Sequence, residues 1–274
     1  MSIVEKEDVE YLYNRLDTRW NSKQVIKKSI HRTKIEKLLN FLEPGKTLLD
    51  VCRGGSVDGI LGVMAAKKGL KVTICSSKQE YLDVIKRFAD VNAVKIDRYV
   101  ICSPDTLLFE DNSFDYVSCI HVLEHVYRYE EAIKEIYRVT NKHILVAMPT
   151  CLNLCVFARI GGADYYKFKW NSIFCLLLGG FKVLLALLTF QKGVFEKNEE
   201  KGIIIKHLQR FPWIIRREFE KNGFKIIQYG ADGFCFPWWK YMIRWQKKLD
   251  KLAYAPFVRN LGFGTHIFAE KRGD

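Results

Sequence analysis

The chain alternates short apolar segments with segments of helical periodicity, and this alternation restricts its fold more than any other feature. Strands are expected at residues 47–52, 71–76, 97–103, 113–120, 142–150, 224–230 and 264–271. Helices are expected between several of them, at residues 59–69, 78–91, 130–140 and 211–223. Strands that are joined through helices pair in parallel. The sequence therefore predicts an α/β fold with a doubly wound, mostly parallel sheet of seven strands.

One domain accounts for the whole length. A chain of 274 residues buries enough surface for a single core. Within residues 1–274 we expect helices over 1–45 that cover the sheet, an apolar insertion at 151–206 and a basic, aromatic insertion at 231–258. The first twenty residues lack the apolar run of a signal peptide, and the eight cysteines form no CxxC pair. A cytoplasmic location is therefore expected.

Positive charge is concentrated in the second part of the sequence. Residues 1–150 carry a net charge of +2, whereas residues 151–274 carry +11 and five of the six tryptophans. A surface that is both basic and rich in large apolar groups favours a partner that is anionic and apolar. An anionic membrane surface fits this description better than nucleic acid, which needs no long run of leucines.

Candidate binding residues follow from the expected sheet. In such folds ligands lie beyond the carboxyl ends of the strands, beside the first strand. The residues at these ends are Asp50, Cys52, Arg53, Gly54 and Gly55 after the first strand, Cys75, Ser76 and Ser77 after the second, Cys102, Ser103, Pro104 and Asp105 after the third, and His121 through His125 after the fourth. The residues among them that we expect to bind a cofactor are Asp50, Cys52, Arg53, Gly54, Cys75, Ser76, Ser103, Asp105 and His121.

Three stretches carry a family resemblance. "LLDVCRGGS" is similar to a glycine-rich LDVGCGxG loop, "LLFEDNSFDYVSCIHVLEHV" to an LPFxDxSFDxVxxxxxLEHV segment, and "HLQRFPWIIRREFEKNGFKII" to the helix and strand that follow. Together they resemble the class I S-adenosylmethionine-dependent methyltransferases, especially the branch of quinone biosynthesis. The resemblance spans roughly residues 45–150 and 205–270. It implies a Rossmann-like methyltransferase fold, S-adenosyl-L-methionine as cofactor and methyl transfer as activity.

The departures from this family fall on the cofactor loop. Cys52 and Ser56 stand where the family has glycines that let the backbone approach the ligand. Cys75 occupies the expected place of an acid that binds both ribose hydroxyls, and a thiol cannot replace those hydrogen bonds. Ser103 lies near the expected adenine contact, with Asp105 able to substitute. We expect weakened cofactor binding, and a noncatalytic, membrane-bound scaffold of the same fold is the alternative function.

Two groups of side chains suggest further chemistry. Cys52, Cys75 and Cys102 end neighbouring strands and could hold a soft metal, although small buried cysteines that fill space are the favoured interpretation. His121, Glu124 and His125 share one face if their segment is helical. We expect these three to act in acid/base chemistry or to face the methyl acceptor, and a divalent metal site is the less favoured alternative, so no metal is assigned.

The apolar insertion contains residues 172–190, where one charge occurs in nineteen positions. A membrane crossing is not expected, because strands of one sheet precede and follow it. Gly179 and Gly180 divide the run, which suggests either a shallow helical hairpin or an interfacial helix. The flanking Lys167, Lys169, Trp170, Lys192 and Lys197 are suited to lipid headgroups. An apolar lid packed on the domain itself is the alternative.

Residues 234–251 form a second candidate contact with lipid. Four aromatic side chains, Trp238, Trp239, Tyr241 and Trp245, alternate there with the basic residues Lys240, Arg244, Lys247 and Lys248. We expect a peripheral or monotopic enzyme on the cytoplasmic face of a membrane, whose acceptor is a lipid, a quinone or a lipid-linked molecule. The sequence indicates neither the atom that is methylated nor an oligomeric state.

Overall fold

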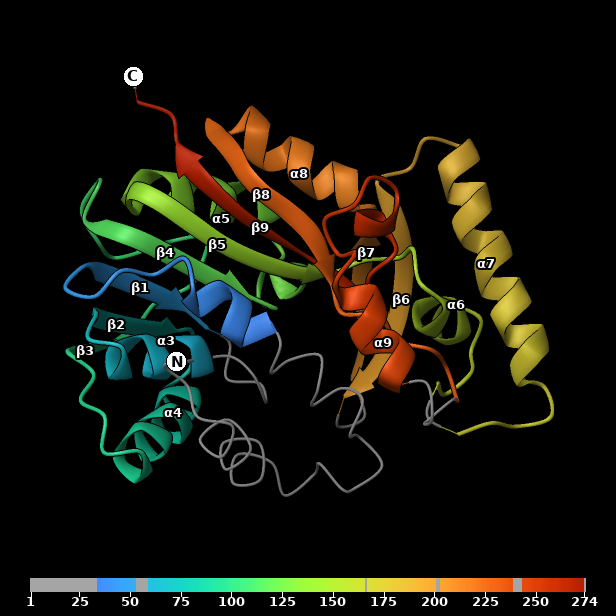
Figure 1. The fold of residues 1–274 in the computed structure, drawn as a ribbon, viewed down its shortest axis with the longest axis horizontal. Coiled ribbons are helices and arrows are strands. Elements are labelled where there is room, and N and C mark those ends of the chain that lie inside the picture. The colour runs from blue at the N-terminus through green and yellow to red at the C-terminus, as the bar shows by residue number, and fades with distance from the viewer. Residues whose placement is uncertain (1–33, 53–58, 166, 201–202, 239–242, 274) are drawn as a thin grey trace.

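A seven-stranded sheet forms the centre of the protein (Figure 1). The computed structural model describes residues 34–52, 59–165, 167–200, 203–238 and 243–273. The strands of the sheet are β1 (Thr47–Val51), β2 (Lys71–Ser76), β3 (Arg98–Ile101), β4 (Phe114–Ile120), β5 (Thr140–Pro149), β8 (Phe224–Asp232) and β9 (Gly264–Lys271). Their spatial order is β3-β2-β1-β4-β5-β9-β8.

The direction of the strands confirms a mostly parallel, doubly wound sheet. Strands β1 to β5 pair in parallel with their neighbours, whereas β9 lies antiparallel between β5 and β8. The order reverses between β1 and β4, because the chain first builds outward to β3 and then returns to the other side of β1. The carboxyl ends of β1 and β4 therefore flank the point where a ligand of such a sheet binds.

Helices cover both faces of the sheet. Those that belong to the central domain are α3 (Ile60–Lys67), α4 (Gln79–Val91), α5 (Tyr129–Val139), α8 (Pro212–Lys221) and α9 (Ile243–Asp250). Leu48 packs with α3 and α4 in one buried cluster, and its neighbour Leu49 packs with α5 and α8 in the other. Adjacent strand residues point to opposite faces, so one short apolar strand supplies both layers of core.

Two glycines end helices where the sequence indicated. Gly69 and Gly223 follow α3 and α8 with φ angles of 96° and 89°, a left-handed conformation that favours glycine. At Gly223 a Cβ atom would also lie 2.6 Å from the ring of Tyr137. Residues 34–39 form a helix, whereas the rest of the expected amino-terminal helices lies outside the described residues.

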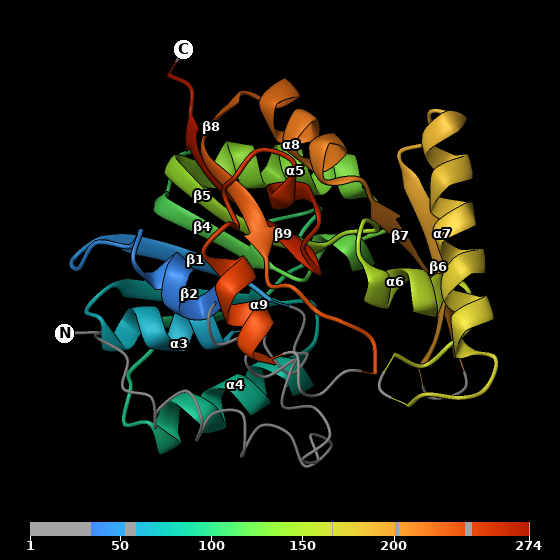
Figure 2. The same ribbon diagram turned by 45° about the vertical axis from the view of Figure 1, so that its right-hand side comes forward.

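The insertion after β5 builds a separate layer at one end of the sheet. It contains α6 (Leu154–Ile160), α7 (Ser172–Leu188) and the two-stranded sheet of β6 (Gly193–Glu200) and β7 (Ile203–Arg210). Figures 1 and 2 both show these elements beside one another, away from β1 to β3. The two ends of the insertion meet, because Thr150 bridges to Arg210 and the Cys151 amide donates to the Arg210 carbonyl at 3.2 Å.

Helix α7 corrects one expectation about this insertion. It runs without a break through Gly179 and Gly180, so the proposed helical hairpin is wrong. Gly179 instead permits close packing, because a Cβ atom there would lie 1.8 Å from the Phe157 carbonyl oxygen of α6. No helix in the described part of the chain combines the length and the apolar character needed to cross a membrane. The sequence pattern did not predict the β6–β7 hairpin.

Candidate functional site

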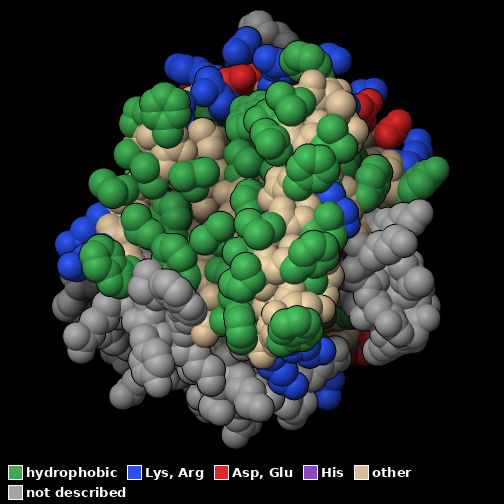
Figure 3. All heavy atoms as spheres, turned by 90° about the vertical axis from the view of Figure 1, so that its right-hand side faces the viewer, with side chains coloured by type: hydrophobic (Ala, Val, Ile, Leu, Met, Phe, Trp, Pro, Cys, Tyr) green, Lys and Arg blue, Asp and Glu red, His purple; other side chains and the backbone are tan. Residues whose placement is uncertain are grey.

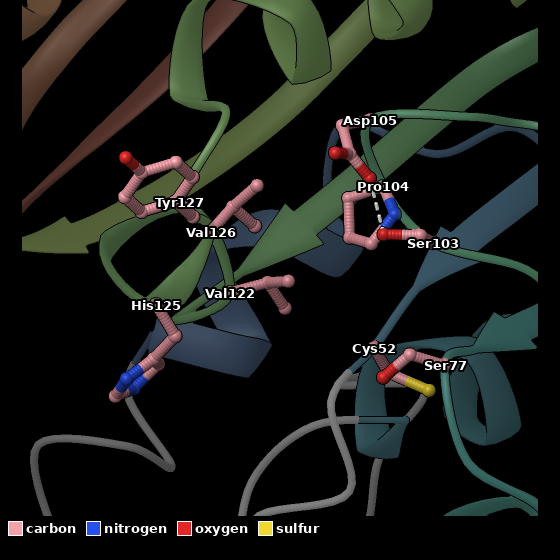
Figure 4. A pocket seen from close by; sticks show the side chains of 9 residues that line it. All are labelled: Cys52, Ser77, Ser103, Pro104, Asp105, Val122, His125, Val126 and Tyr127. Carbon is pink, nitrogen blue, oxygen red and sulfur yellow. Dashed lines mark hydrogen bonds between the residues drawn. The ribbon is translucent and has the colours of Figure 1, made fainter. Parts of the chain in front are cut away.

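A cavity of about 220 Å³ lies at the carboxyl ends of β1 to β4 (Figure 4). Its lining residues are Cys52, Ser77, Ser103, Pro104, Asp105, Val122, His125, Val126 and Tyr127. In Figure 4 the side chains of Cys52 and Ser77 lie next to each other, and those of Val122 and Val126 come from the segment after β4. The cavity therefore combines an apolar wall with hydroxyl, carboxyl and imidazole groups.

Four residues that were expected to bind the cofactor or to act in catalysis line this cavity. Cys52, Ser103, Asp105 and His125 do so, and the Ser103 hydroxyl donates a hydrogen bond to the Asp105 carboxylate. Arg53 and Gly54 lie outside the described residues. Residues that were selected because they follow β1, β3 and β4 therefore line one cavity.

Cys75 does not reach the cavity. Its side chain is fully buried in the core, and both a hydrogen bond with Cys102 and burial raise the pKa of its thiol well above the usual range. The Cys52 thiol donates to the Cys75 carbonyl at 3.2 Å, so the sheet does gather the three thiols. Among the residues that the structure describes, no group of three histidine, cysteine or acidic side chains is placed to hold a metal ion. All three cysteines are buried, and Cys52 also lines the cavity.

The two serines after Cys75 differ in position. Ser76 is buried, and its hydroxyl oxygen has no hydrogen-bond partner among the residues that the structure describes. Ser77 lines the cavity. Because the chain turns away from the sheet after β2, the position that faces a ligand lies two residues beyond the one that the sequence suggested. Ser77 therefore occupies the place where a contact to a ribose would be expected.

Asp50 is a buried carboxylate that joins three elements. One of its oxygens accepts a hydrogen bond from the Gly62 amide of α3 at 2.9 Å, and the other accepts from the Ser118 hydroxyl of β4 at 2.5 Å. Burial raises its pKa to about 6, against the lowering effect of these two bonds. Asp50 is not among the residues that line the cavity, so its binding role stays a prediction, while its contacts fix the start of the first loop.

Replacing Asp50 by asparagine should change how stability depends on pH. The raised pKa of Asp50 means that the folded protein binds a proton between about pH 6 and pH 4, where the unfolded chain does not. The wild type therefore gains about 2 kcal/mol from this group as the pH falls from 7 to 4, and Asp50→Asn does not. Urea unfolding of both proteins at the two pH values measures the difference. An identical pH dependence in both would contradict it.

His121 ends β4 in an unusual conformation. Its φ angle is 57°, which is uncommon for a residue other than glycine. Its Nδ1 lies 3.2 Å from Glu124 Oε1, and its Nε2 contacts the Lys34 ammonium. Burial and the Lys34 charge lower the pKa of His121. Burial alone would raise the pKa of Glu124, but the hydrogen bond from His121 and the nearby imidazoles hold it below its usual value.

Lys34 links this group to the far strands of the sheet. It is almost fully buried and forms an ion pair with Asp232 at the end of β8. Burial opposes ionisation of Asp232, yet the Lys34 charge keeps its pKa low. Burial lowers the pKa of the nearby His266 to about 4. A buried charge is tolerated only when it is paired, so this network fixes the segment at residue 34 against the site.

His125 meets a residue from the insertion. Its Nδ1 lies 2.9 Å from Nε2 of His207 on β7. The segment around it is a short 3₁₀ turn over Leu123–His125, and His121 precedes that turn, so the assumed regular helix is wrong. Glu124 nevertheless lies between the two imidazoles, 3.9 Å from His125 Nε2. Of the three residues expected to act in catalysis, His125 lines the cavity.

Several residues of the site escaped the sequence analysis. Val126 and Tyr127 line the cavity just beyond the residues considered after the fourth strand, so a slightly longer stretch there would have included them. Lys34, His207 and Asp232 come from distant segments, and their side chains meet only because the sheet order and the insertion bring them together. No local pattern in the sequence marks these three.

Comparisons with known proteins agree with this geometry. Residues 49–147 match the family model described as a methyltransferase domain. The chain is 26% identical over 193 residues to the ubiquinone/menaquinone biosynthesis C-methyltransferase UbiE of Rickettsia akari (strain Hartford), which covers 67% of this chain and 72% of that protein.

Two solved structures share the fold. A putative S-adenosylmethionine-dependent methyltransferase from Listeria monocytogenes has a TM-score of 0.58 and 14% identity, covering 90% of this chain and 99% of the other. The magnesium protoporphyrin IX methyltransferase of Synechocystis PCC 6803 with bound SAH has a TM-score of 0.56 and 14% identity, covering 96% and 94%. The sheet order, the matching methyltransferase domain and these similar proteins together support a class I S-adenosylmethionine-dependent methyltransferase.

Proposed function

We propose that this methyltransferase binds to an anionic membrane surface through α7 and methylates a lipid, a quinone or a lipid-linked acceptor. One observation carries the proposal, namely that α7 buries mostly small side chains and exposes its large apolar ones. Its buried positions are Ser172, Cys175, Gly179, Val183 and Ala186, most of them small. Its exposed large side chains are Ile173, Phe174, Leu177, Phe181, Leu184, Leu185, Leu187 and Leu188.

This arrangement opposes the usual pattern of a surface helix. A helix on a water-soluble protein buries its large apolar side chains and exposes its polar ones. In α7 the small face packs on α6, and the large apolar side chains remain outside (Figure 3). A contiguous apolar patch of this kind marks an interaction site. The alternative of a lid packed on the domain's own core does not fit side chains that point away from it.

Basic groups surround the apolar face. Lys167, Lys169, Lys182 and Lys192 are all exposed, and Trp170 is 96% exposed. Figure 3 shows lysine and arginine side chains at the margins of the apolar surface. Tryptophan and lysine at the edge of an apolar surface suit the headgroup region of a bilayer. The charge pattern therefore favours an anionic membrane over a neutral apolar partner.

The second expected contact adjoins the same face. The Trp238 ring packs edge-on against Phe168, with ring centroids 5.4 Å apart, and its Nε1 donates to the Asp164 carbonyl at 2.8 Å. Residues 239–242 lie outside the described residues. Farther on, Trp245 is exposed and lies 5.0 Å from the Lys248 ammonium. These contacts support one surface formed by both insertions.

Flotation of the wild-type protein with liposomes tests the membrane proposal. The protein should float with vesicles that contain anionic phosphatidylserine and float less with pure phosphatidylcholine. Each basic residue near an anionic surface contributes about 1 kcal/mol, so added salt should weaken binding without abolishing it. Protein that stays at the bottom of the gradient with anionic vesicles at low salt would refute the proposal.

The cavity fits the adenosine part of S-adenosylmethionine. Val122 and Val126 offer an apolar wall for a flat base, and the Asp105 carboxylate can accept hydrogen bonds from an amine. Ser77 offers one hydroxyl to the ribose, and Cys52 lies beside the loop that would face the methionine part. When bound, this cofactor supplies an electrophilic methyl group. The chain's own residues bind it, exclude water and remove a proton.

Replacing Ser77 by aspartate should tighten binding of S-adenosylhomocysteine by roughly tenfold or more, because a charged hydrogen bond contributes about 1.5–3 kcal/mol. Ser77 lines the cavity, where a carboxylate remains in contact with solvent or ligand. Isothermal titration calorimetry of both proteins measures the change. Ser77→Asn is the uncharged control. Equal affinity for Ser77 and Ser77→Asp would remove this residue from the ribose site.

The acceptor must lose a proton when it gains a methyl group. His125 is the imidazole that lines the cavity, and imidazole is the side chain best suited to accept a proton near neutral pH. The relative from Rickettsia akari is named for ubiquinone and menaquinone biosynthesis, which supports an apolar acceptor that carries such a proton. Label from S-[methyl-³H]adenosylmethionine should enter the organic phase of a membrane extract. A protein that binds no cofactor at millimolar concentration would instead be a scaffold.

A further inference from the structure

His207 lies at the contact between the insertion and the cofactor site. It belongs to β7, outside the central sheet, and only 4% of its surface is exposed. Its ring meets that of His125 edge to face, with centroids 4.2 Å apart and planes at 83°. The 2.9 Å separation of His207 Nε2 and His125 Nδ1 is a hydrogen-bond distance. An insertion residue therefore touches a side chain that lines the cavity.

A hydrogen bond between two imidazoles requires a defined arrangement of protons. One ring nitrogen must carry the proton, and the other must present a lone pair. The bond therefore fixes the orientation of the His125 ring and couples the protonation of its Nδ1 to that of His207 Nε2. Its other nitrogen, Nε2, faces Glu124 Oε1 at 3.9 Å.

The strand that carries His207 is itself held in place. The side-chain amide of Gln209, two residues on and on the same face of β7, donates to Glu196 Oε2 at 2.8 Å. Glu196 is buried on β6 and forms an ion pair with Arg159 of α6. Helix α6 packs closely against α7. His207 is thus supported by a rigid layer and not by a free loop.

We infer that His207 is a positioning residue, which holds the His125 ring at the wall of the cavity by the Nδ1–Nε2 hydrogen bond. The insertion then does more than bind lipid, because it completes the site where the acceptor gives up its proton. This inference rests on the proposed function in one respect, namely that His125 faces the acceptor. The hydrogen bond itself is tested without any acceptor or membrane.

Nuclear magnetic resonance of the full chain with ¹⁵N-labelled histidine provides the test. Wild type should show a scalar coupling between the two ring nitrogens across the hydrogen bond, and His125→Gln assigns the signal. His207→Phe should lose the coupling and shift the His125 Nδ1 resonance. His207→Gln offers both an amide donor and a carbonyl acceptor, so it should restore the Nδ1 resonance toward the wild-type position.

Absence of the coupling in the folded wild type would overturn the inference, as would an unchanged His125 Nδ1 resonance in folded His207→Phe. If His207→Phe fails to fold by circular dichroism, the wild-type coupling and His207→Gln decide the question. Liposome flotation and cofactor calorimetry of the wild type are separate measurements from the coupling. Failure of those two measurements in the wild type would refute the proposed function and leave the His125–His207 bond untouched.

Discussion

Changing Leu177, Leu184 and Leu188 together to serine should weaken binding to anionic vesicles by about a hundredfold or more. All three side chains lie on the outer face of α7, and each is at least half exposed to water. Transfer of such a leucine surface into the bilayer contributes at least about 1 kcal/mol per side chain, which for three residues corresponds to roughly a hundredfold. Co-sedimentation over a range of lipid concentrations measures the partition coefficient.

A matched control distinguishes the effect of the outer face of α7 from the effect of exposed apolar side chains elsewhere on the protein. Ile101, Leu108 and Ile227 are also half exposed or more, but they lie on other elements. Their triple change to serine should leave vesicle binding within about twofold of the wild type, since surface substitutions away from the interface contribute little. Equal loss of binding in both triple variants would refute a specific role for α7. Concentration-dependent dimers that dissociate in the α7 variant would identify a second copy as the occupant.

Gly179→Ala should destabilise the protein by about 4 kcal/mol. The added Cβ atom would lie 1.8 Å from the Phe157 carbonyl oxygen and 3.0 Å from the Gly161 amide nitrogen, both of them backbone atoms that cannot move aside cheaply. Forcing atoms into a packed contact costs 1–3 kcal/mol in ordinary cores, and a backbone clash costs more. Urea unfolding followed by circular dichroism measures the loss.

The neighbouring glycine is the control for this experiment. At Gly180 a Cβ atom would lie 3.4 Å from the Phe157 ring, an ordinary contact. Alanine is favoured over glycine inside a helix by about 1 kcal/mol, so Gly180→Ala should be neutral or stabilising. The two substitutions differ by one position and should have opposite signs. Similar effects at both positions would show that α6 and α7 do not pack as closely as described.

The central sheet was readable from the sequence because it follows from local patterns. Each strand of the parallel part is a short apolar run, and most of these runs are separated by segments with helical periodicity. Gly69 and Gly223 marked helix ends through a conformation that other residues adopt only with strain. Because topology fixes where strands end, Cys52, Ser103 and Asp105 were also placed correctly beside one cavity.

The remainder of the site depends on contacts between distant segments. The sequence placed Cys75 where the family has an acid that binds the ribose. The structure instead buries Cys75 and brings Ser77 to the cavity. The periodicity of the sequence does not show this shift of two residues. The His125–His207 pair joins residues 82 positions apart. Gly179 and Gly180 indicated a break in a helix, because an isolated sequence does not show that another helix packs against the first of them.

The meeting of the two ends of the insertion has a consequence for how such a protein could arise or be rebuilt. Thr150 and Arg210 lie side by side, so the chain leaves the sheet and returns to it at nearly the same point. An excursion with adjacent ends can be lengthened, shortened or exchanged at little cost in loop entropy. Transplanting residues 151–210 between β5 and the next helix of a relative would then transfer the exposed apolar face of α7 together with one of the two paired imidazoles.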